Sequence, residues 1–171
     1  VMKKPNLNMK RASLLTSSLL CSALLIAVPL RKELNEGWQF KQARLSNWYP
    51  ATVPGVVHTD LMDNGLIEDP YYRLNERSLQ WIDKEDWIYE VSFDAGALTR
   101  GYEHVRLEFL GLDTYADVFL NETQILTADN MFRRWRTEVK RLLRPGENTL
   151  KVYFHSPIKV DLPKYDSLPY R

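Results

Sequence analysis

The residue types that most often perform chemistry are scattered in this 171-residue sequence. Its three histidines, His58, His104 and His155, lie far apart and lack the short spacings of a zinc site, so we expect ordinary surface or core positions for them. Cys21 is the only cysteine, which excludes a disulfide within the chain. No two carboxylates are singled out by their spacing as an acid and a base. We therefore expect no metal, no cofactor and no catalytic residue in this chain.

The distribution of charge separates the first 30 residues from the rest. Residues 1–30 contain four basic side chains and no acidic one, whereas the remainder carries 19 basic and 22 acidic side chains. A mildly acidic body with dispersed charges offers no electrostatic footprint to a phosphate backbone. Nucleic acid is therefore not an expected partner.

Residues 1–30 have the composition of a secretory signal peptide region. Two cations precede an apolar stretch with small residues that ends near Pro29, and several Ser and Thr side chains interrupt it, which favours a signal over a transmembrane anchor. We expect a periplasmic or secreted protein with no membrane attachment after signal removal. Lipidation of Cys21 is a minor alternative, because Leu20 precedes it where a small residue would be needed.

Residues 31–171 show mainly the period-two alternation of strands with one buried face. In the clearest example Val105, Leu107 and Phe109 alternate with two charged residues, and Asn121-Glu122 is suited to a tight turn between two later strands. Short strands joined by turns, with no long amphipathic helix, predict an all-β jelly-roll β-sandwich. Strands are expected over residues 38–41, 87–94, 105–109, 115–120, 124–127 and 150–155.

Three stretches depart from this alternation. Residues 58–65 and 75–82 have the composition of short helical turns, the first with Asn64-Gly65 as a stop. Residues 161–171 are rich in proline and in polar and aromatic side chains. We expect this last stretch to be a loop cut in mid-course, so that the domain of residues 31–171 is incomplete at its C-terminal end.

Three segments together carry a resemblance to a known family. The first runs from Val53-Pro54-Gly55 to Trp87-Ile88-Tyr89, the second from Gly111 to Asn121, and the third joins Asn130-Met131-Phe132-Arg133 to residues 145–157. Over about residues 33–157, their order and spacing resemble the N-terminal sugar-binding domain of glycoside hydrolase family 2. The first segment resembles the β-mannosidase branch, whereas the other two are shared with β-galactosidases and β-glucuronidases.

The resemblance implies a galactose-binding-like jelly roll that is followed in the parent enzyme by an immunoglobulin-like domain and a (β/α)₈ barrel carrying both catalytic carboxylates. That enzyme would be a retaining exo-β-mannosidase that hydrolyses terminal β-D-mannose residues from oligosaccharides. Retaining glycosidases need two carboxyl groups about 5 to 5.5 Å apart. Asn75-Glu76 has the same two residue types as the acid/base dipeptide of such barrels, but it lies within the pattern of the N-terminal domain. The chain alone is therefore expected to be inactive. The alternatives are a free-standing carbohydrate-binding module and the same domain of a β-galactosidase or β-glucuronidase.

By the same resemblance, Asp69, Asn75 and Trp81 lie in a connection that approaches the mouth of the barrel. Asn offers a donor and an acceptor to a sugar hydroxyl, and Trp offers an apolar face to a pyranose ring. The alternative is that Asp69 and Asn75 cap turns and that Trp81 fills the core. The basic run of residues 133–144 is expected on a solvated face or at a neighbouring domain. The tryptophans beside strand patterns are expected in the core or an interface: Trp38, Trp87 and Trp135.

Overall fold

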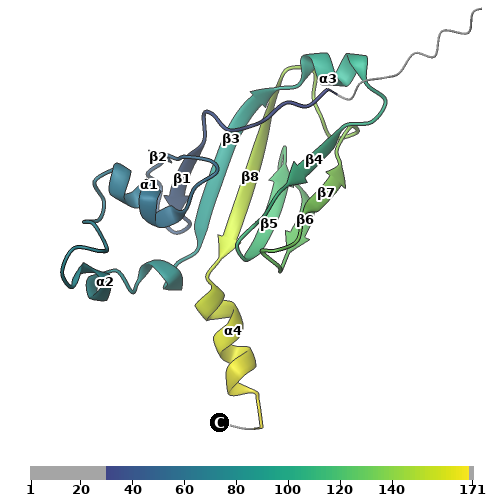
Figure 1. The fold of residues 1–171 in the computed structure, drawn as a ribbon. Helices are drawn as coiled ribbons and strands as arrows, with labels where there is room; N and C mark the ends of the chain where they lie inside the picture. Colours follow the sequence, from purple (N-terminus) through teal and green to yellow (C-terminus); the bar gives the residue numbers. More distant parts are fainter. Residues whose placement is uncertain (1–29, 170–171) are drawn as a thin grey trace, which may run out of the picture. The chain divides into compact units, whose positions relative to one another are not determined.

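Eight strands within residues 30–169 form two antiparallel sheets (Figure 1). The computed structural model describes these residues. The large sheet has the order β2-β1-β3-β8-β5-β6, and the small sheet pairs β4 with β7. The strands are β1 (Gln39–Gln42), β2 (Tyr49–Pro50), β3 (Trp87–Asp94), β4 (Arg106–Phe109), β5 (Tyr115–Leu120), β6 (Thr123–Ala128), β7 (Trp135–Glu138) and β8 (Glu147–His155).

Short helices occupy the connections and the end of the described part. They are α1 (Val57–Asp63), α2 (Asn75–Ser78), the 3-10 turn η1 (Ile82–Lys84), α3 (Gly96–Gly101) and α4 (Pro157–Asp166). Among the residues that the structure describes, no helix has the length and apolar character needed to cross a membrane. The predicted helical turns at residues 58–65 and 75–82 correspond to α1 and to α2 with the start of η1.

The alternation predicted for the central strands is confirmed by burial. β3 pairs with β8 over eight residues, from Trp87 opposite Phe154 to Asp94 opposite Glu147. Their apolar side chains share one face of the sheet with those of β1 and β5, because every second residue of a strand points the same way. The fully buried members of this face include Phe40, Val91, Val118, Leu120 and Leu150.

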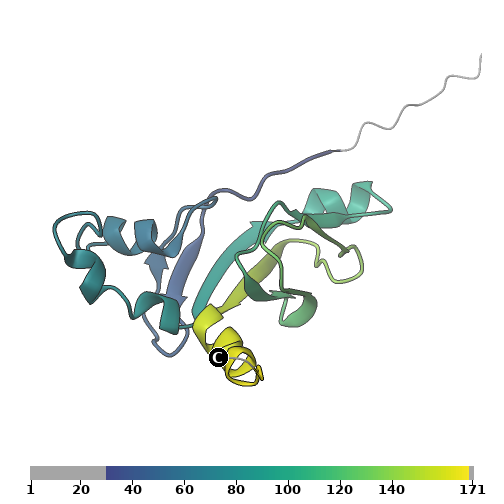
Figure 2. The ribbon, with the colours of Figure 1, turned by 60° about the horizontal axis from the view of Figure 1, so that its bottom comes forward.

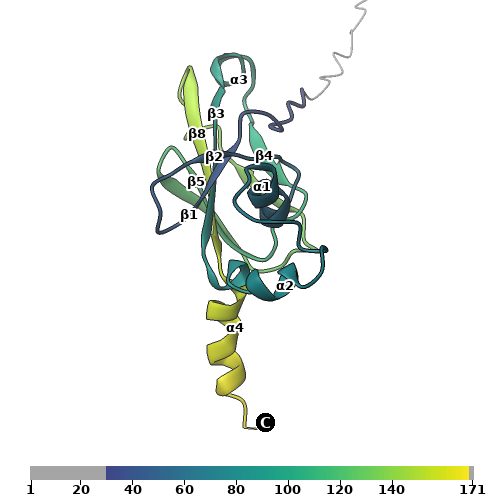
Figure 3. The ribbon, with the colours of Figure 1, turned by 90° about the vertical axis from the view of Figure 1, so that its left-hand side faces the viewer.

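The small sheet and α1 form the second layer. Figure 3 shows both of them on the same side of the large sheet. The strand β4 lies opposite β7 in a register that pairs Leu107 with Thr137 and Phe109 with Trp135. Leu107, Phe109 and Trp135 are half-buried against the core. The expected all-β jelly-roll sandwich is therefore the architecture observed, and its core lies between the two layers.

The turn predicted at Asn121-Glu122 is confirmed between β5 and β6. Both residues have positive φ, 49° and 69°, as the favoured two-residue hairpin turns require. The Asn121 side chain also donates to the Leu142 carbonyl and to Asn148 Oδ1, and accepts from the Thr149 amide. Asn148 is 1% exposed, so this network satisfies a buried polar side chain while it fixes the turn.

The prediction of a loop over residues 161–171 is wrong for residues 161–166, which form the end of α4, and residues 170 and 171 lie outside the described part of the chain. Ser156 caps this helix by accepting a hydrogen bond from the Lys159 amide, and Pro157 occupies its first turn, where a missing N–H costs nothing. Pro163 lies inside the helix, where it removes one backbone hydrogen bond and its ring crowds the carbonyl of Lys159, so it weakens α4 without ending it. The density of prolines suggested a loop, whereas within α4 only Pro163 occupies a position that disfavours a helix.

Three further elements were not predicted. The strand β7 lies inside the basic run and owes its form to pairing with β4, which is distant in sequence. The strand β2 is two residues long, and α3 is bounded by Gly96 and Gly101, which are poor helix formers. In each case the local sequence gives little signal and tertiary contacts decide.

Candidate functional site

The connection from β2 to β3, which carries Asp69, Asn75 and Trp81, is fixed to the large sheet through α1. Asp60 in α1 is 1% exposed, and its carboxylate accepts hydrogen bonds from the Tyr89 hydroxyl at 2.7 Å and from the Thr52 amide at 2.8 Å. Burial, together with the Asp60 carboxylate, raises the pKa of Tyr89 far above its usual value, so this phenol stays protonated. The connection therefore rests on a buried polar anchor.

Two of the predicted residues, Asp69 and Asn75, are brought together. Asp69 Oδ1 accepts from the Tyr71 amide at 2.8 Å, and Asn75 Nδ2 donates to the Asp69 carbonyl at 2.9 Å. These bonds give both residues a role in the turn that leads into α2. Within residues 30–169, no hydrogen bond to the side-chain oxygen of Asn75 is present, so that oxygen can accept from a ligand.

The third predicted residue, Trp81, lies just before η1 and is 37% exposed. The centres of the Trp81 and Trp87 rings lie 6.0 Å apart, and the Trp87 indole N–H donates to the Ile82 carbonyl. Trp81 is thus outside the buried core, and an apolar surface remains open to solvent. In the described part of the chain, no hydrogen bond or ring contact links Trp81 to Asp69 or Asn75.

The other tryptophans expected in strands behave as predicted. Trp38 and Trp87 are buried, 8% and 6% exposed, and Trp135 is half-buried. The predicted solvated face of the basic run is also present: Arg136 donates to Glu108 Oε1 through both Nε and Nη2, and the side chains are 59% and 34% exposed. Arg133 stacks over the Trp135 ring at 4.4 Å.

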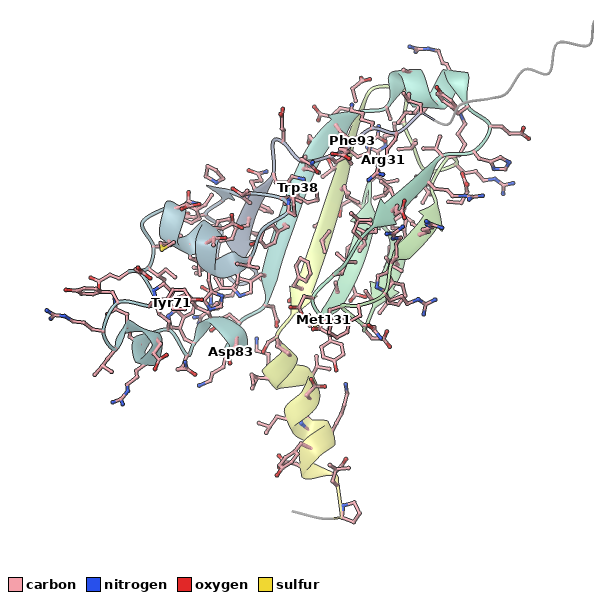
Figure 4. The ribbon with its side chains drawn as sticks, in the orientation of Figure 1. Arg31, Trp38, Tyr71, Asp83, Phe93 and Met131 are labelled. Carbon is pink, nitrogen blue, oxygen red and sulfur yellow. The ribbon has the colours of Figure 1, made fainter. Side chains whose placement is uncertain are left out.

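Two features, one in this connection and one in β1, were not predicted from the sequence. Tyr71 is 96% exposed and Tyr72 57%, so the connection presents aromatic surface at its edge. Figure 4 shows Tyr71 and Asp83 on this connection. The second feature is Gln42, which is 8% exposed and whose side-chain nitrogen is buried without a hydrogen-bond partner within the described residues. Gln42 follows Phe40 by two residues, so the strand period could have placed it inward.

Four carboxyl groups have pKa values that are shifted away from the range of a general acid. Asp86, Asp117, Glu138 and Asp161 have their pKa values lowered, the opposite of what a glycosidase acid needs. For Asp86, burial alone would raise the pKa, but hydrogen bonds from the Ser156 amide, Tyr153 and Lys159 outweigh it. Across residues 30–169, no three metal-binding side chains gather in one place.

Comparison with known proteins establishes the family of this chain. The model of the family described as "Glycosyl hydrolase 2 galactose-binding domain-like" matches residues 38–171. The chain belongs to this family. The chain is 36% identical over 140 residues to the β-mannosidase of Rattus norvegicus, covering 82% of this chain and 16% of the relative. It is 40% identical over 126 residues to β-mannosidase B of Emericella nidulans, covering 71% of this chain and 15% of the relative.

Solved structures agree with this assignment. The crystal structure of the β-D-mannosidase from Dictyoglomus thermophilum matches with a TM-score of 0.77 and 45% identity, over 80% of this chain and 17% of that one. An exo-chitosanase from Amycolatopsis orientalis matches with a TM-score of 0.61 at 20% identity, over 70% of this chain and 16% of that one, and shows the fold alone. The chain thus spans about a sixth of the length of these relatives.

Proposed function

We propose that this chain is the non-catalytic sugar-binding-type domain of a retaining exo-β-mannosidase that hydrolyses terminal β-D-mannose residues from oligosaccharides. The observation that carries the proposal is the contrast in identity: 45% to a β-D-mannosidase, against 17 to 21% to β-glucuronidases of the same fold. The partners in this proposal are a β-mannoside oligosaccharide and the immunoglobulin-like and barrel domains of the parent enzyme. Catalysis belongs to the barrel.

A chimera tests this proposal. Residues 33–169 would replace the matched part of the D. thermophilum β-D-mannosidase, and release of the aglycone from an aryl β-mannoside would be measured. We expect turnover by the chimera and none above background by the 171-residue chain, because no carboxylate pair suited to retaining hydrolysis is recognisable in it. Turnover by the chain that disappears on replacing one of its own Asp or Glu residues would contradict the proposal.

In this proposal Asn75 and Trp81, with Asp69 holding the turn, form a rim of the substrate site. The support is geometric: the side-chain oxygen of Asn75 can accept from a sugar hydroxyl, and the half-exposed Trp81 can face a pyranose ring. We expect Asn75→Ala in the chimera to lower kcat/KM by about 2- to 10-fold, the equivalent of one neutral hydrogen bond. The melting temperature should change little, because only the bond to the Asp69 carbonyl is lost.

Ser78→Ala is the matched control for Asn75→Ala. Ser78 lies in the same short helix, is exposed, and its hydroxyl donates to the Asn75 carbonyl at 2.8 Å, so the substitution also removes one local hydrogen bond. It should leave kcat/KM unchanged. If both variants lose activity equally, or if Asn75→Ala lowers stability as strongly as a core truncation, Asn75 acts as a turn residue and not at the substrate.

The proposed enzyme acts in the periplasm or outside the cell. The support is the cationic and then apolar order of residues 1–30, of which residues 1–29 lie outside the described part of the chain. Mass spectrometry of the protein recovered from the periplasm or medium should show that the N-terminus begins after about residue 30. Intact protein confined to the cytosol would contradict export.

A further inference from the structure

The helix α1 is followed directly by Asn64-Gly65, the only Asn-Gly pair in the sequence. In such a pair the backbone nitrogen of the glycine can attack the side-chain carbon of the asparagine and release its amide as ammonia. Glycine favours this attack, because no Cβ crowds its nitrogen and its backbone rotates freely. Asn64 is therefore the position where spontaneous deamidation is chemically easiest, provided that the two atoms can meet.

Backbone hydrogen bonds hold this pair in a closed turn at the end of α1. The Asn64 amide donates to the Asp60 carbonyl at 3.1 Å, and the Gly65 amide donates to the Met62 carbonyl at 2.9 Å. The amide after Gly65 donates to the Leu61 carbonyl at 2.8 Å. Gly65 has a positive φ of 67°, which this way of closing a helix requires. The nitrogen that would attack is thus already engaged in a hydrogen bond.

The side chain of Asn64 is held as well as its backbone. Its Nδ2 donates to the Pro50 carbonyl at 2.9 Å and to the Asp60 carbonyl at 2.7 Å, so both hydrogens of this nitrogen are used. Pro50 belongs to β2, and two views of the molecule place α1 next to this strand (Figures 1 and 2). The Asn64 amide therefore joins the end of the helix to the edge of the large sheet.

The backbone angle of Asn64 keeps the reacting atoms apart. Its ψ is 6°, so the Gly65 nitrogen nearly eclipses the backbone nitrogen of Asn64 and is rotated away from the Asn64 Cβ. Closure of a five-membered ring requires the Gly65 nitrogen to turn toward the side chain. That rotation cannot take place while the hydrogen bonds of the turn persist.

We propose that Asn64-Gly65 is a site of spontaneous deamidation that the folded end of α1 suppresses and that reacts when this end opens. The Gly65 nitrogen loses its proton and forms a bond to Asn64 Cγ, the bond from Cγ to Nδ2 breaks, and ammonia leaves. Water then opens the resulting succinimide at either carbonyl and leaves aspartate or isoaspartate at position 64. The reaction needs no reagent other than water, and the inference does not depend on the proposed function.

The product cannot take over the role of the asparagine. A carboxylate has no hydrogen to donate, so it would place a negative charge against the Pro50 and Asp60 carbonyl oxygens. Isoaspartate would in addition lengthen the backbone inside the turn. Either product separates the end of α1 from β2. Because α1 anchors the connection from β2 to β3, deamidation should loosen that connection irreversibly.

Peptide mapping by mass spectrometry tests the proposal. The 171-residue chain would be incubated at mildly alkaline pH, which favours loss of the proton from the attacking nitrogen, in buffer and in denaturing urea. We expect conversion of Asn64 to be at least about 10-fold slower in buffer, because the reaction must wait for local opening. Asp60→Ala, which removes the anchor of α1, should speed the reaction in buffer. Leu107→Ala, a truncation in the small sheet, should not.

Asn64→Asp reproduces one product and measures its effect on the fold. We expect a lower melting temperature and faster limited proteolysis between β2 and β3 than in the unmodified chain. Asn47→Asp makes the same chemical change at an exposed position between β1 and β2 and should alter neither. If Asn64→Asp does not fold, Asn64→Ala removes the same two donated hydrogen bonds without adding a charge.

Four results would overturn the proposal. Equal conversion in buffer and in urea would show that the fold gives no protection, and no conversion in urea would show that the pair is not reactive. Equal acceleration by Asp60→Ala and Leu107→Ala would show that the reaction waits for global unfolding and not for opening of α1. Unchanged stability of Asn64→Asp would show that the modification does not affect the connection.

Discussion

Replacing Phe40 by Ala should lower the free energy of unfolding by about 3 to 5 kcal/mol, the usual cost of truncating a fully buried aromatic residue. Phe40 is 0% exposed, and its ring lies 5.5 Å from Tyr89, 6.0 Å from Trp87 and 6.1 Å from Tyr49. The side chain therefore joins β1 to β2 and β3. Urea unfolding followed by tryptophan fluorescence would measure the loss.

Leu107→Ala is the control for this truncation. The alternation of its strand predicts Leu107 on the buried face, and the structure places it half-buried in the small sheet, whereas Phe40 is fully buried. Truncation of Leu107 should cost about half as much as the same change at a fully buried site, because less apolar area leaves contact with protein. A cost for Phe40→Ala that is no greater than for Leu107→Ala would show that β1 is not part of the cooperative core.

Asp60→Ala should have the second large effect, a loss of about 2 to 4 kcal/mol in the free energy of unfolding, since two hydrogen bonds to a charged group are lost and the buried Tyr89 hydroxyl is left without its acceptor. The substitution deprives the Tyr89 hydroxyl and the Thr52 amide of their acceptor. Both donors lie on segments that α1 holds together, so the connection that carries Asn75 and Trp81 should loosen as well. Chemical denaturation gives the free energy, and limited proteolysis reports the loosening.

Tyr89→Phe separates the two donors. It removes the hydroxyl but keeps the ring, which stacks on Phe40 and meets Phe154 edge-on, so the packing is retained. Its cost should be smaller than that of Asp60→Ala, because the Thr52 amide keeps its acceptor. If Tyr89→Phe costs as much as Asp60→Ala, the contribution of Asp60 is confined to this one bond.

The strands with regular alternation could be predicted because the order of apolar and polar residues within each strand indicates which face is buried. In β3 all four alternate residues from Trp87 to Phe93 are buried, and the sequence identified the bounds of this strand. The strand β7 could not be found in this way, since its cross-strand pairing of Arg136 with Glu108 is a contact between distant residues. The helix α4 could not be predicted from its proline-rich composition alone. The Ser156 cap followed by Pro157 is the local signal for the start of a helix there.

For the candidate site, the sequence indicated the connection but not its internal geometry. The bond from Asn75 to the Asp69 carbonyl depends on the backbone path between them, which includes Arg73 at a positive φ of 55°. A positive φ at a residue other than Gly, Asn or Asp is uncommon, so no local rule would have placed it there. The exposure of Trp81 likewise depends on how η1 packs against Trp87.

The edges of the large sheet determine how this domain can associate with other chains. On one side the last strand, β2, is two residues long and ends in Pro50, which has no amide hydrogen to offer. On the other side β6 pairs with β5 through a register shift between Val118 and Phe119. Short, proline-bearing and irregular edges are poor templates for strand addition, which limits aggregation through the backbone. Strand addition at either edge is therefore disfavoured, and recognition of this sheet through side chains is favoured instead.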